Sequence, residues 1–427
     1  MPKSLIRRHS QWYEMLLFSS LLQFFIGFTV VVLLPIWLHW NYISLSLPLE
    51  SVQINTLLSN TVAYSVSFYI LYKFRCFPGT RTFPFIIPTL LMTWLVVFAI
   101  LLFLREEFYS RPVLFWSFVL ANIWAFLGYF VGIRFNQPRL ALVPFGRALE
   151  LADTQRAIVT VLDKTDLEGR RYDGVVADLH AEDLPNAWQQ FLASCILAHI
   201  PVFHTQQLIE SITGRVTIDH LSENFLGSLL PSSLFSVVKQ VLEVCMVLFM
   251  VPLWLPVMLI TGIVIKLESD GPMFFIQERV GQGNKDFKVY KLRSMCKDSE
   301  KDGAQFAQVK DMRITRVGHF IRKTRLDEIP QFINVLKGDM SIIGPRPEQR
   351  AFVDQFEKEI PFYSYRHVVK PGITGWAQVM HGYAASADDT RIKIEHDFYY
   401  IKYFSLWLDI LIVAKTVRTI LTGFGAR

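Results

Sequence analysis

Cysteine is scarce in this 427-residue chain, which holds four copies, Cys76, Cys195, Cys245 and Cys296. No CxxC pair and no metal-ligand spacing joins them, so neither a disulfide framework nor a zinc site is indicated. They are most simply buried or lipid-facing thiols. The sequence therefore belongs neither to the disulfide-rich secreted domains nor to the cysteine-based zinc proteins.

Charged residues are also few. They make up 19% of the chain, against 52% hydrophobic residues, and the mean hydropathy is +0.32. This balance is too apolar for an ordinary soluble protein and indicates a membrane protein. The formal net charge of +6 implies only mild attraction to anionic partners such as lipid headgroups or nucleotides. We expect no nucleic acid among its partners.

Residues 1–138 contain four apolar stretches, each near the ~20 residues that cross a bilayer core. They are Met15–Leu38, Val52–Tyr72, Phe85–Leu104 and Val113–Ile133. The second is the most polar and is predicted to pack inside a four-helix transmembrane bundle. Basic residues gather before the first stretch, between the second and third, and after the fourth. By the positive-inside rule, the N-terminus and everything after the fourth helix are cytoplasmic.

Residues 139–231 alternate short apolar runs with helical segments, which predicts a small α/β domain of Rossmann-like type. Its first apolar run leads into Val143-Pro144-Phe145-Gly146-Arg147, a turn with one glycine and no GxGxxG. The phosphate-binding fingerprint is therefore missing. We interpret the domain as a degenerate Rossmann-like module with a structural, oligomerising or regulatory role. A ligand site is the alternative.

A fifth apolar stretch, Val237–Lys266, is long enough to span a bilayer but contains Pro252 and Pro256. Two prolines four residues apart can bend a helix sharply, because proline lacks an N–H donor and clashes with the preceding turn. A full crossing would place the following basic region outside the cell. We therefore predict a re-entrant membrane helix over about residues 235–266, which enters and leaves by the cytoplasmic leaflet. A kinked spanning helix is the alternative.

The acid pair Asp327-Glu328 lies inside a dense cationic cluster in the last third of the chain. The cations are Arg313, Arg316, Arg322, Lys323 and Arg325. Pro330 and the apolar residues after it predict that the pair begins a helix. The positive helix end and the arginines would keep both acids ionised and attract a phosphate. Neighbouring helix residues point about 100° apart, so one acid can face phosphorus and the other a metal.

Upstream of the pair, the Gly281–Asn284 cluster between two β-prone runs predicts a hairpin. Lys291 and Arg293 on its second strand are two residues apart and so share a face, where they could contact phosphate oxygens. A solvated strand face is the alternative for these two cations.

Downstream of the pair, Arg346 stands between Pro345 and Pro347. The two prolines limit the backbone on either side. This arrangement predicts a preorganised guanidinium that binds a phosphate or a uracil edge.

Five motifs from about Ser233 to the C-terminus carry a family resemblance. In order they are Gly271–Gly281, Tyr290–Met295, Leu326–Gln331, Gly338–Pro347 and Lys370–Trp376. They resemble the bacterial sugar transferase family, the monotopic polyprenyl-phosphate sugar-1-phosphate transferases. The N-terminal bundle and middle segment are similar to its large members. One departure is Leu255, which stands before Pro256 where many members have serine, so the bend would depend on the two prolines.

The resemblance implies a mixed α+β catalytic domain over residues 232–427, on the cytoplasmic side of the bacterial inner membrane. It implies transfer of a sugar 1-phosphate from a UDP-sugar to polyprenyl (undecaprenyl) phosphate with release of UMP, the initiating step of surface polysaccharide or glycoconjugate synthesis. Asp327 would be the nucleophile that forms an aspartyl phosphosugar. Glu328 would join it in holding Mg²⁺. Arg346 would contact the uridine or its phosphates, and the expected substrate-binding set also includes Lys291, Arg293, Arg325, Pro345 and Pro347.

Two other interpretations stay open. A non-catalytic protein that docks membranes and assembles a polysaccharide export system would explain the basic charge, but not the acid pair within it. A glycosyltransferase that uses the acids only as metal ligands would release UDP instead of UMP. The sequence identifies neither the sugar nor the pathway, and it leaves self-association open. The aromatic tail Phe398–Leu421 is either an interfacial helix or part of the core.

Overall fold

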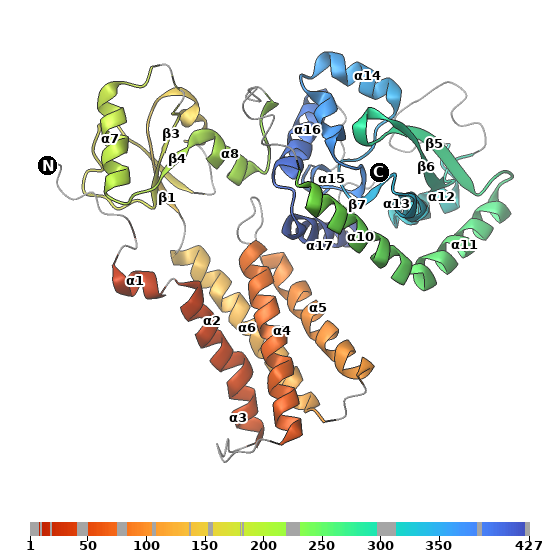
Figure 1. Ribbon diagram of the computed structural model, residues 1–427, viewed down its shortest axis with the longest axis horizontal. Coiled ribbons are helices and arrows are strands. Elements are labelled where there is room, and N and C mark those ends of the chain that lie inside the picture. The colour runs from red at the N-terminus through yellow and green to blue at the C-terminus, as the bar shows by residue number, and fades with distance from the viewer. Residues whose placement is uncertain are drawn as a thin grey trace. The chain divides into compact units, whose positions relative to one another are not determined.

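The computed structural model describes residues 8, 11–17, 19–40, 50–74, 83–104, 108–135, 138–152, 157–179, 181, 183–218, 231–296, 313–381 and 387–422. The chain divides into two compact units, Met1–Gly214 and Arg215–Arg427. The first unit contains a helix bundle and a small α/β domain, and the second is a mixed α+β domain (Figure 1).

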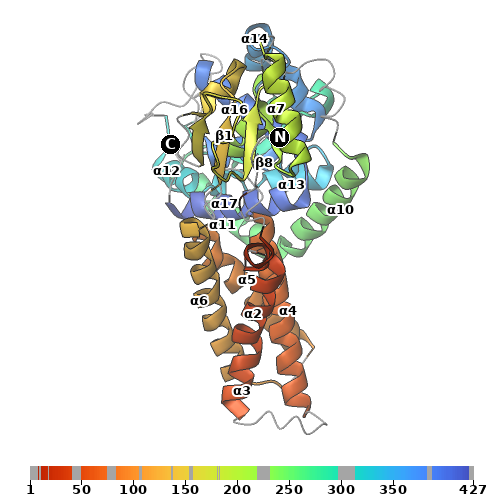
Figure 2. The same cartoon turned by 90° about the vertical axis from the view of Figure 1, so that its left-hand side faces the viewer.

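The bundle consists of long apolar helices that run side by side (Figure 2). Its elements are α1 (Trp12–Leu17), α2 (Ser20–Phe28), a π-helical turn (Thr29–Leu33), α3 (Leu34–Trp40), α4 (Ser51–Phe74), α5 (Phe83–Phe103) and α6 (Arg111–Phe135). The π-turn joins α2 and α3 into one continuous helix. These elements cover the four stretches that the hydropathy pattern predicts.

Four helical segments of the described chain are long and apolar enough to cross a membrane. They are Ser20–Trp40, Phe85–Phe103, Arg111–Gly132 and Val251–Glu268. The first three belong to the bundle and the last to the second unit. The 24-residue α4 is less apolar and buries the polar residues Thr56, Ser59, Asn60 and Ser67. The prediction that the second stretch is a polar helix packed inside the bundle is confirmed.

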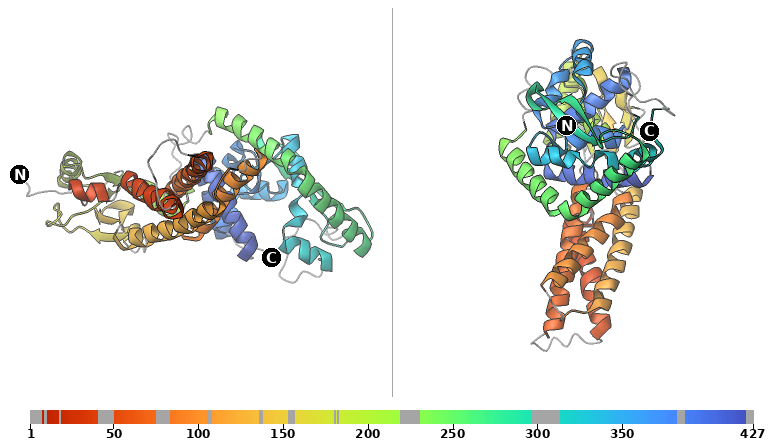
Figure 3. Two further views of the ribbon diagram at one scale, coloured as in Figure 1. Left: turned by 90° about the horizontal axis from the view of Figure 1, so that it is seen from below. Right: turned by 90° about the vertical axis from the view of Figure 1, so that its right-hand side faces the viewer.

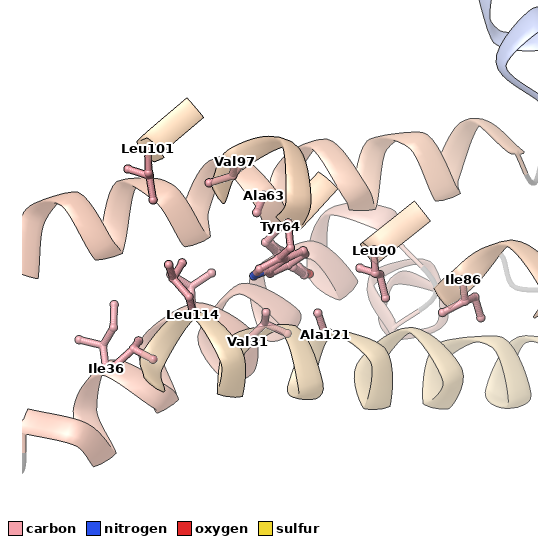
Figure 4. Packing of buried hydrophobic residues seen from close by; sticks show 13 residues of the cluster. Val31, Ile36, Ala63, Tyr64, Ile86, Leu90, Val97, Leu101, Leu114 and Ala121 are labelled. Carbon is pink, nitrogen blue, oxygen red and sulfur yellow. The ribbon is translucent and has the colours of Figure 1, made fainter. Parts of the chain in front are cut away.

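The bundle core is built around Tyr64 of α4, which lies among aliphatic side chains of the neighbouring helices (Figure 4). Its hydroxyl donates to the Phe24 carbonyl of α2 at 3.0 Å. Gly27 makes this approach possible, because a Cβ there would collide with Tyr64 and with Trp124 of α6. Small residues at such crossings let helices pack closely where lipid supplies no hydrophobic force between them.

The α/β domain is a four-stranded parallel sheet in the order β2-β1-β3-β4. Its strands are β1 (Arg139–Leu142), β2 (Ile158–Val161), β3 (Gly174–Ala177) and β4 (Val202–His204). One face packs against α7 (Asn186–Leu197), and the other against α8 (Thr205–Thr213) and the 3₁₀ turn Gly146–Leu151. Because both faces are covered, β3 is buried along its whole length. The predicted α/β pattern is confirmed.

The second unit begins with α10 (Ser233–Phe249) and α11 (Val251–Glu268), which form the two arms of a V in Figure 3. The helix breaks at Met250. Pro252 lies in the first turn of α11, where proline is tolerated, and Pro256 remains inside that helix. The expectation that both prolines make the bend is therefore corrected: the break precedes them, and Pro252 alone adjoins it.

The rest of this unit contains the β5–β6 hairpin, the short β7–β8 pair and the helices that pack on them. Its elements are β5 (Phe274–Val280), β6 (Asp286–Leu292), α12 (Arg316–Lys323), α13 (Gln331–Lys337), β7 (Ser341–Ile343), α14 (Arg350–Glu359), β8 (Gly372–Thr374), α15 (Trp376–Met380), α16 (Ala387–Lys402) and α17 (Leu406–Thr422). β5 and β6 are antiparallel, and β7 and β8 are parallel. The predicted hairpin is confirmed.

The aromatic tail of the second unit contributes to the core, as one of its two interpretations predicts, and the interfacial helix stays a prediction. Phe398, Tyr400 and Leu411 are fully buried, so one face of α16 and α17 is core. Val413 and Val417 remain exposed on α17. Core packing and an exposed apolar face thus coexist on the same helix pair.

Candidate active site

Asp327 and Glu328 lie on one 3₁₀ turn, Leu326–Glu328, between α12 and α13. Arg325 before it adopts left-handed backbone with φ 59°. α13 begins only at Gln331 and has seven residues. The prediction that the pair begins the helix is therefore corrected: the pair lies on a separate short turn that precedes the helix. A helix this short contributes little field, so the ionisation of the acids depends on neighbouring side chains.

Glu328 is buried and ion-paired. Its Oε1 accepts from Arg346 Nη2 at 3.1 Å and from Arg325 Nη1 at 3.5 Å. Burial by itself would raise the pKa of this carboxyl, but the charges of Arg346, Lys291 and Arg325 prevail and lower its pKa to about 2. Glu328 is therefore ionised at any physiological pH.

Asp327 differs from its neighbour. Its Oδ1 is buried and has no hydrogen-bond partner among the described residues. Burial and the adjacent charge of Glu328 raise the pKa of Asp327 to about 6, against the opposing effect of Lys291, Arg325 and Arg322. The expectation that both acids are firmly ionised holds for Glu328, whereas Asp327 changes its charge close to neutral pH. A buried carboxylate oxygen without a partner is poorly stabilised and available to react.

The structure brings Lys291 of β6 to the acid pair. Burial, followed by the charges of Arg279 and Arg346, lowers the pKa of Lys291 to about 7. Glu328 and Asp327 act in the opposite direction. Lys291 is thus a cation that can lose its charge near neutral pH.

Arg293 does not join Lys291 at this site. Its Nη1 donates to the Asp270 carbonyl at 2.9 Å, and its Nη2 donates to the Ser269 carbonyl at 2.7 Å. These bonds fasten the end of α11 to the hairpin. β6 ends at Leu292, one residue before Arg293. The predicted phosphate contact of Arg293 is replaced by this structural role.

Arg346 projects from the loop between β7 and α14. The backbone approaches β8 closely here, since a Cβ at Gly344 or Gly372 would overlap the other strand. The Gly344 N–H donates to the Thr374 carbonyl at 2.8 Å, and the Gly372 N–H donates to Pro345 at 2.9 Å. The described contacts thus bring Arg346 to the acids, while Pro345 shapes the loop.

Two further arginines, Arg279 and Arg366, receive no role from the sequence. Arg279 Nη1 donates to the Pro347 carbonyl at 2.5 Å, and Arg366 Nη2 donates to the Arg346 carbonyl at 2.9 Å. Arg279 lies in Gly271–Gly281, the first of the five motifs, so the sequence offered a signal for this segment but not for the residue. No sequence signal points to Arg366.

The acid pair suits a magnesium ion. Among the described residues, no group of three or more His, Cys, Asp or Glu side chains converges. Magnesium is commonly bound by one or two carboxylates, with water and substrate phosphates completing its shell. The carboxylates of Asp327 and Glu328, adjacent on one turn, provide such a pair.

Known proteins resemble the chain in the region of this site and beyond it. The family model for bacterial sugar transferases matches residues 234–423. UDP-N-acetylgalactosamine-undecaprenyl-phosphate N-acetylgalactosaminephosphotransferase of Aeromonas hydrophila is 55% identical over 426 residues, which are 99% of each chain. The chain belongs to the bacterial sugar transferase family. The resemblance that the five motifs predict is confirmed, and it extends over the bundle and the α/β domain.

Two other relatives match less than half of this chain. A UDP-glucose:undecaprenyl-phosphate glucose-1-phosphate transferase of Caulobacter vibrioides is 42% identical over 203 residues, 47% of this chain and 76% of the relative. An enzyme of the same name from Escherichia coli is 46% identical over 165 residues, 38% of this chain and 35% of the relative. All three relatives are enzymes by name, which removes the support for a non-catalytic docking protein.

Proposed function

We propose that this enzyme transfers a sugar 1-phosphate from a UDP-sugar to undecaprenyl phosphate, giving undecaprenyl-diphosphate-sugar and UMP. The observation that carries the proposal is the acid pair itself. Asp327 presents a buried oxygen without a partner, next to Glu328, which is fixed in its charged form by Arg346. The names of the relatives support this donor and acceptor.

The chemistry proceeds in two displacements at one phosphorus. Asp327 Oδ1 attacks the phosphorus that bears the sugar, and the bond from that phosphorus to the bridging oxygen breaks, so that UMP leaves with the electron pair. A phosphate oxygen of the lipid then attacks the aspartyl phosphosugar and releases the carboxylate. The two steps consume and release no net proton.

Cations offset the repulsion between these anions. Arg346, Arg325 and Lys291 surround the pair and would contact the diphosphate or the uridine, and Pro345 and Pro347 shape the loop that presents Arg346. When bound to Asp327 and Glu328, Mg²⁺ would neutralise charge on the donor diphosphate. Glu328 is charged whenever Asp327 is, and so it fits metal binding better than proton transfer.

The proposed location is the bacterial inner membrane, with the catalytic unit cytoplasmic and α10–α11 re-entrant. Support comes from the break at Met250 and from the apolar residues beside it, since Phe249 is 86% exposed and Leu253 66% exposed. The charge asymmetry of the loops points the same way. Five basic residues of the segments that flank the apolar stretches, Lys3, Arg7, Arg75, Arg81 and Arg105, lie outside the described residues.

The proposed domains are residues 1–138, 139–231 and 232–427. The parallel order of the middle sheet fits a Rossmann-like fold. Asp178, which follows β3, accepts from the Arg147 N–H at 3.1 Å, so its carboxylate reaches the turn after β1, where Rossmann-like folds bind phosphate. This internal carboxylate supports a degenerate domain with a structural, oligomerising or regulatory role.

A donor panel tests the function. UDP-N-acetylgalactosamine is the first donor to offer, because the whole-length relative is named for it, and UDP-glucose is its comparison. With undecaprenyl phosphate as acceptor, we expect UMP and a lipid diphosphate product. Release of UDP would instead establish a glycosyltransferase, and no nucleotide release from any donor would refute the proposal.

A further inference from the structure

The loop that carries Arg346 is held through its carbonyl oxygens. Between Ile343 and Glu348, five of them accept hydrogen bonds from elements far apart in the sequence. The donors, in chain order of the acceptor, are Tyr400 Oη at 3.0 Å, the Gly372 N–H at 2.9 Å, Arg366 Nη2 at 2.9 Å, Arg279 Nη1 at 2.5 Å and the Val280 N–H at 2.9 Å. Such a set leaves the loop little freedom to move.

Side chains supply three of these bonds for a physical reason. Pro345 and Pro347 have no N–H, so the loop cannot continue the pairing of β7. Its carbonyls still need donors, because buried backbone oxygens without a partner are costly. Guanidinium groups can donate to a carbonyl and still form an ion pair. The carbonyls of Arg346 and Pro347 are each held by one arginine.

Arg366 is the more deeply buried of the two arginines, at 3% exposure. Its Nη2 donates both to the Arg346 carbonyl and to Asp397 Oδ2, the latter at 2.8 Å. Its Nη1 donates to Tyr363 Oη at 2.8 Å. Asp397 on α16 is 1% exposed. The Arg366–Asp397 ion pair therefore has a fixed geometry. It is linked to the site through the backbone of Arg346.

A merely structural ion pair would explain the contact between Arg366 and Asp397, since buried charges need partners. It would not explain why the same Nη2 also holds the backbone of Arg346, the residue that makes the shorter of the two arginine contacts to Glu328. The chain of contacts runs from Asp397 to Arg366, to the Arg346 carbonyl, and through the Arg346 side chain to Glu328 at 3.1 Å.

We propose that Arg366, fixed by Asp397, is a positioning residue that sets the backbone of Arg346 so that its guanidinium meets Glu328. Arg366 touches neither the acids nor, by this proposal, the donor. The role of Arg346 in donor binding rests on the proposed function, whereas its placement against Glu328 does not.

The first test is kinetic. In full-length Asp397→Asn and Arg366→Lys, we expect the KM for the UDP-sugar to rise on the order of tenfold, because Arg346 loses its orientation. The KM for undecaprenyl phosphate should stay unchanged. A simple loss of folded enzyme would lower kcat and leave both KM values as in the wild type. That result would overturn the proposal.

The second test needs no activity. Phenylglyoxal modifies accessible, unpaired guanidinium groups, and peptide mass spectrometry measures its rate at Arg346, with the partly exposed Arg147 of the first unit as the internal reference. We expect Arg346 to react several-fold faster in both variants than in the wild type. An unchanged rate at Arg346 would contradict the positioning role even if activity were lost. If no donor releases nucleotide but Arg346 reacts slowly in the wild type, the proposed function fails and the positioning role of Arg366 does not.

Two variants complete the design. Tyr363→Phe removes only the acceptor of Arg366 Nη1 and keeps the volume, so it should shift KM and Arg346 reactivity in the same direction by a smaller factor. It decides the question if the ion-pair variants fail to fold. Arg350→Lys is the matched control, because Arg350 also joins two segments, through Asp286 and Asn284, at an exposed position. It should change neither the donor KM nor the rate at Arg346.

Discussion

Asp178 in the α/β domain and Asp327 in the second unit are both carboxylates in turns, but their surroundings differ. Asp178 Oδ2 accepts from the Arg147 N–H at 3.1 Å, and its Oδ1 lies 3.8 Å from His204 Nε2. Asp327 Oδ1 is buried without a hydrogen-bond partner among the described residues. In the α/β domain, the Asp178 side chain occupies the place beside the Arg147 N–H where a bound anion could lie. The second unit leaves a carboxylate oxygen available for a substrate.

The largest effect should follow from replacing Asp327, whose Oδ1 has no hydrogen-bond partner among the described residues. Asp327→Asn keeps the shape and removes the attacking charge, so the rate should fall on the order of a thousandfold or more. With UDP-sugar and Mg²⁺ but no lipid, the intact wild-type protein should gain one sugar-phosphate mass and release one UMP. The variant should gain none. An adduct on Asp327→Asn, or UMP release only with lipid present, would replace the two-step mechanism with direct transfer.

Glu328→Gln should be the next most damaging change, on the order of a hundredfold in rate, through lost metal and phosphate positioning. The substitution also removes the neighbouring charge that helps to raise the pKa of Asp327. The acidic limb of the pH–rate profile should therefore move to lower pH. A profile that keeps its wild-type acidic limb would show that Glu328 does not influence the ionisation of Asp327.

The pH dependence of the wild type should be bell-shaped. Asp327, with its pKa raised to about 6, must be ionised to attack, so the rate falls as the pH drops through that value. Lys291, with its pKa lowered to about 7, loses its charge above that value, so donor binding weakens as the pH rises. Single-turnover UMP release without lipid measures both limbs. Lys291→Arg should keep its charge and flatten the alkaline limb only.

The smallest effect should come from the partnered carboxylate. Asp178→Asn weakens an acceptor of a backbone N–H, which is worth about 1 kcal/mol of local stability. Hydrogen exchange in the full-length protein should rise in peptides covering β1 and the turn after it. UMP release should stay within about twofold of wild type, because every residue of the proposed site lies in the second unit. A large loss of transferase activity would show that the α/β domain takes part in the reaction.

Patterns of local origin were predicted well. Hydropathy located the bundle helices, including the polar one, because the bilayer and the bundle core impose a length and a period on the sequence. Alternating apolar runs located the four parallel strands, and the glycine cluster at Gly281–Asn284 located the hairpin. The acid pair was noticed because two carboxylates lie together in an otherwise basic segment, a pattern that often marks a functional site.

Properties that depend on contacts between distant segments were missed or wrong. Arg293 shares a motif with Lys291, but its guanidinium donates hydrogen bonds to the carbonyls that follow α11. The helix break falls at Met250, before the prolines. Asp397, 31 residues from Arg366, carries no motif that links the two. Sequence spacing does not contain these pairings, because they arise only when the elements pack.

The sequence by itself thus determined the class of protein, its membrane segments, its family and the identity of the acid pair, since each depends on composition or on residues near one another in the chain. The tertiary structure decided the pKa, and so the charge, of each of the two acids. Burial raises the pKa of Asp327 to about 6, while Arg346, brought from 18 residues away, holds Glu328 in its charged form. Two adjacent carboxylates differ because desolvation and charge act through space and not along the chain.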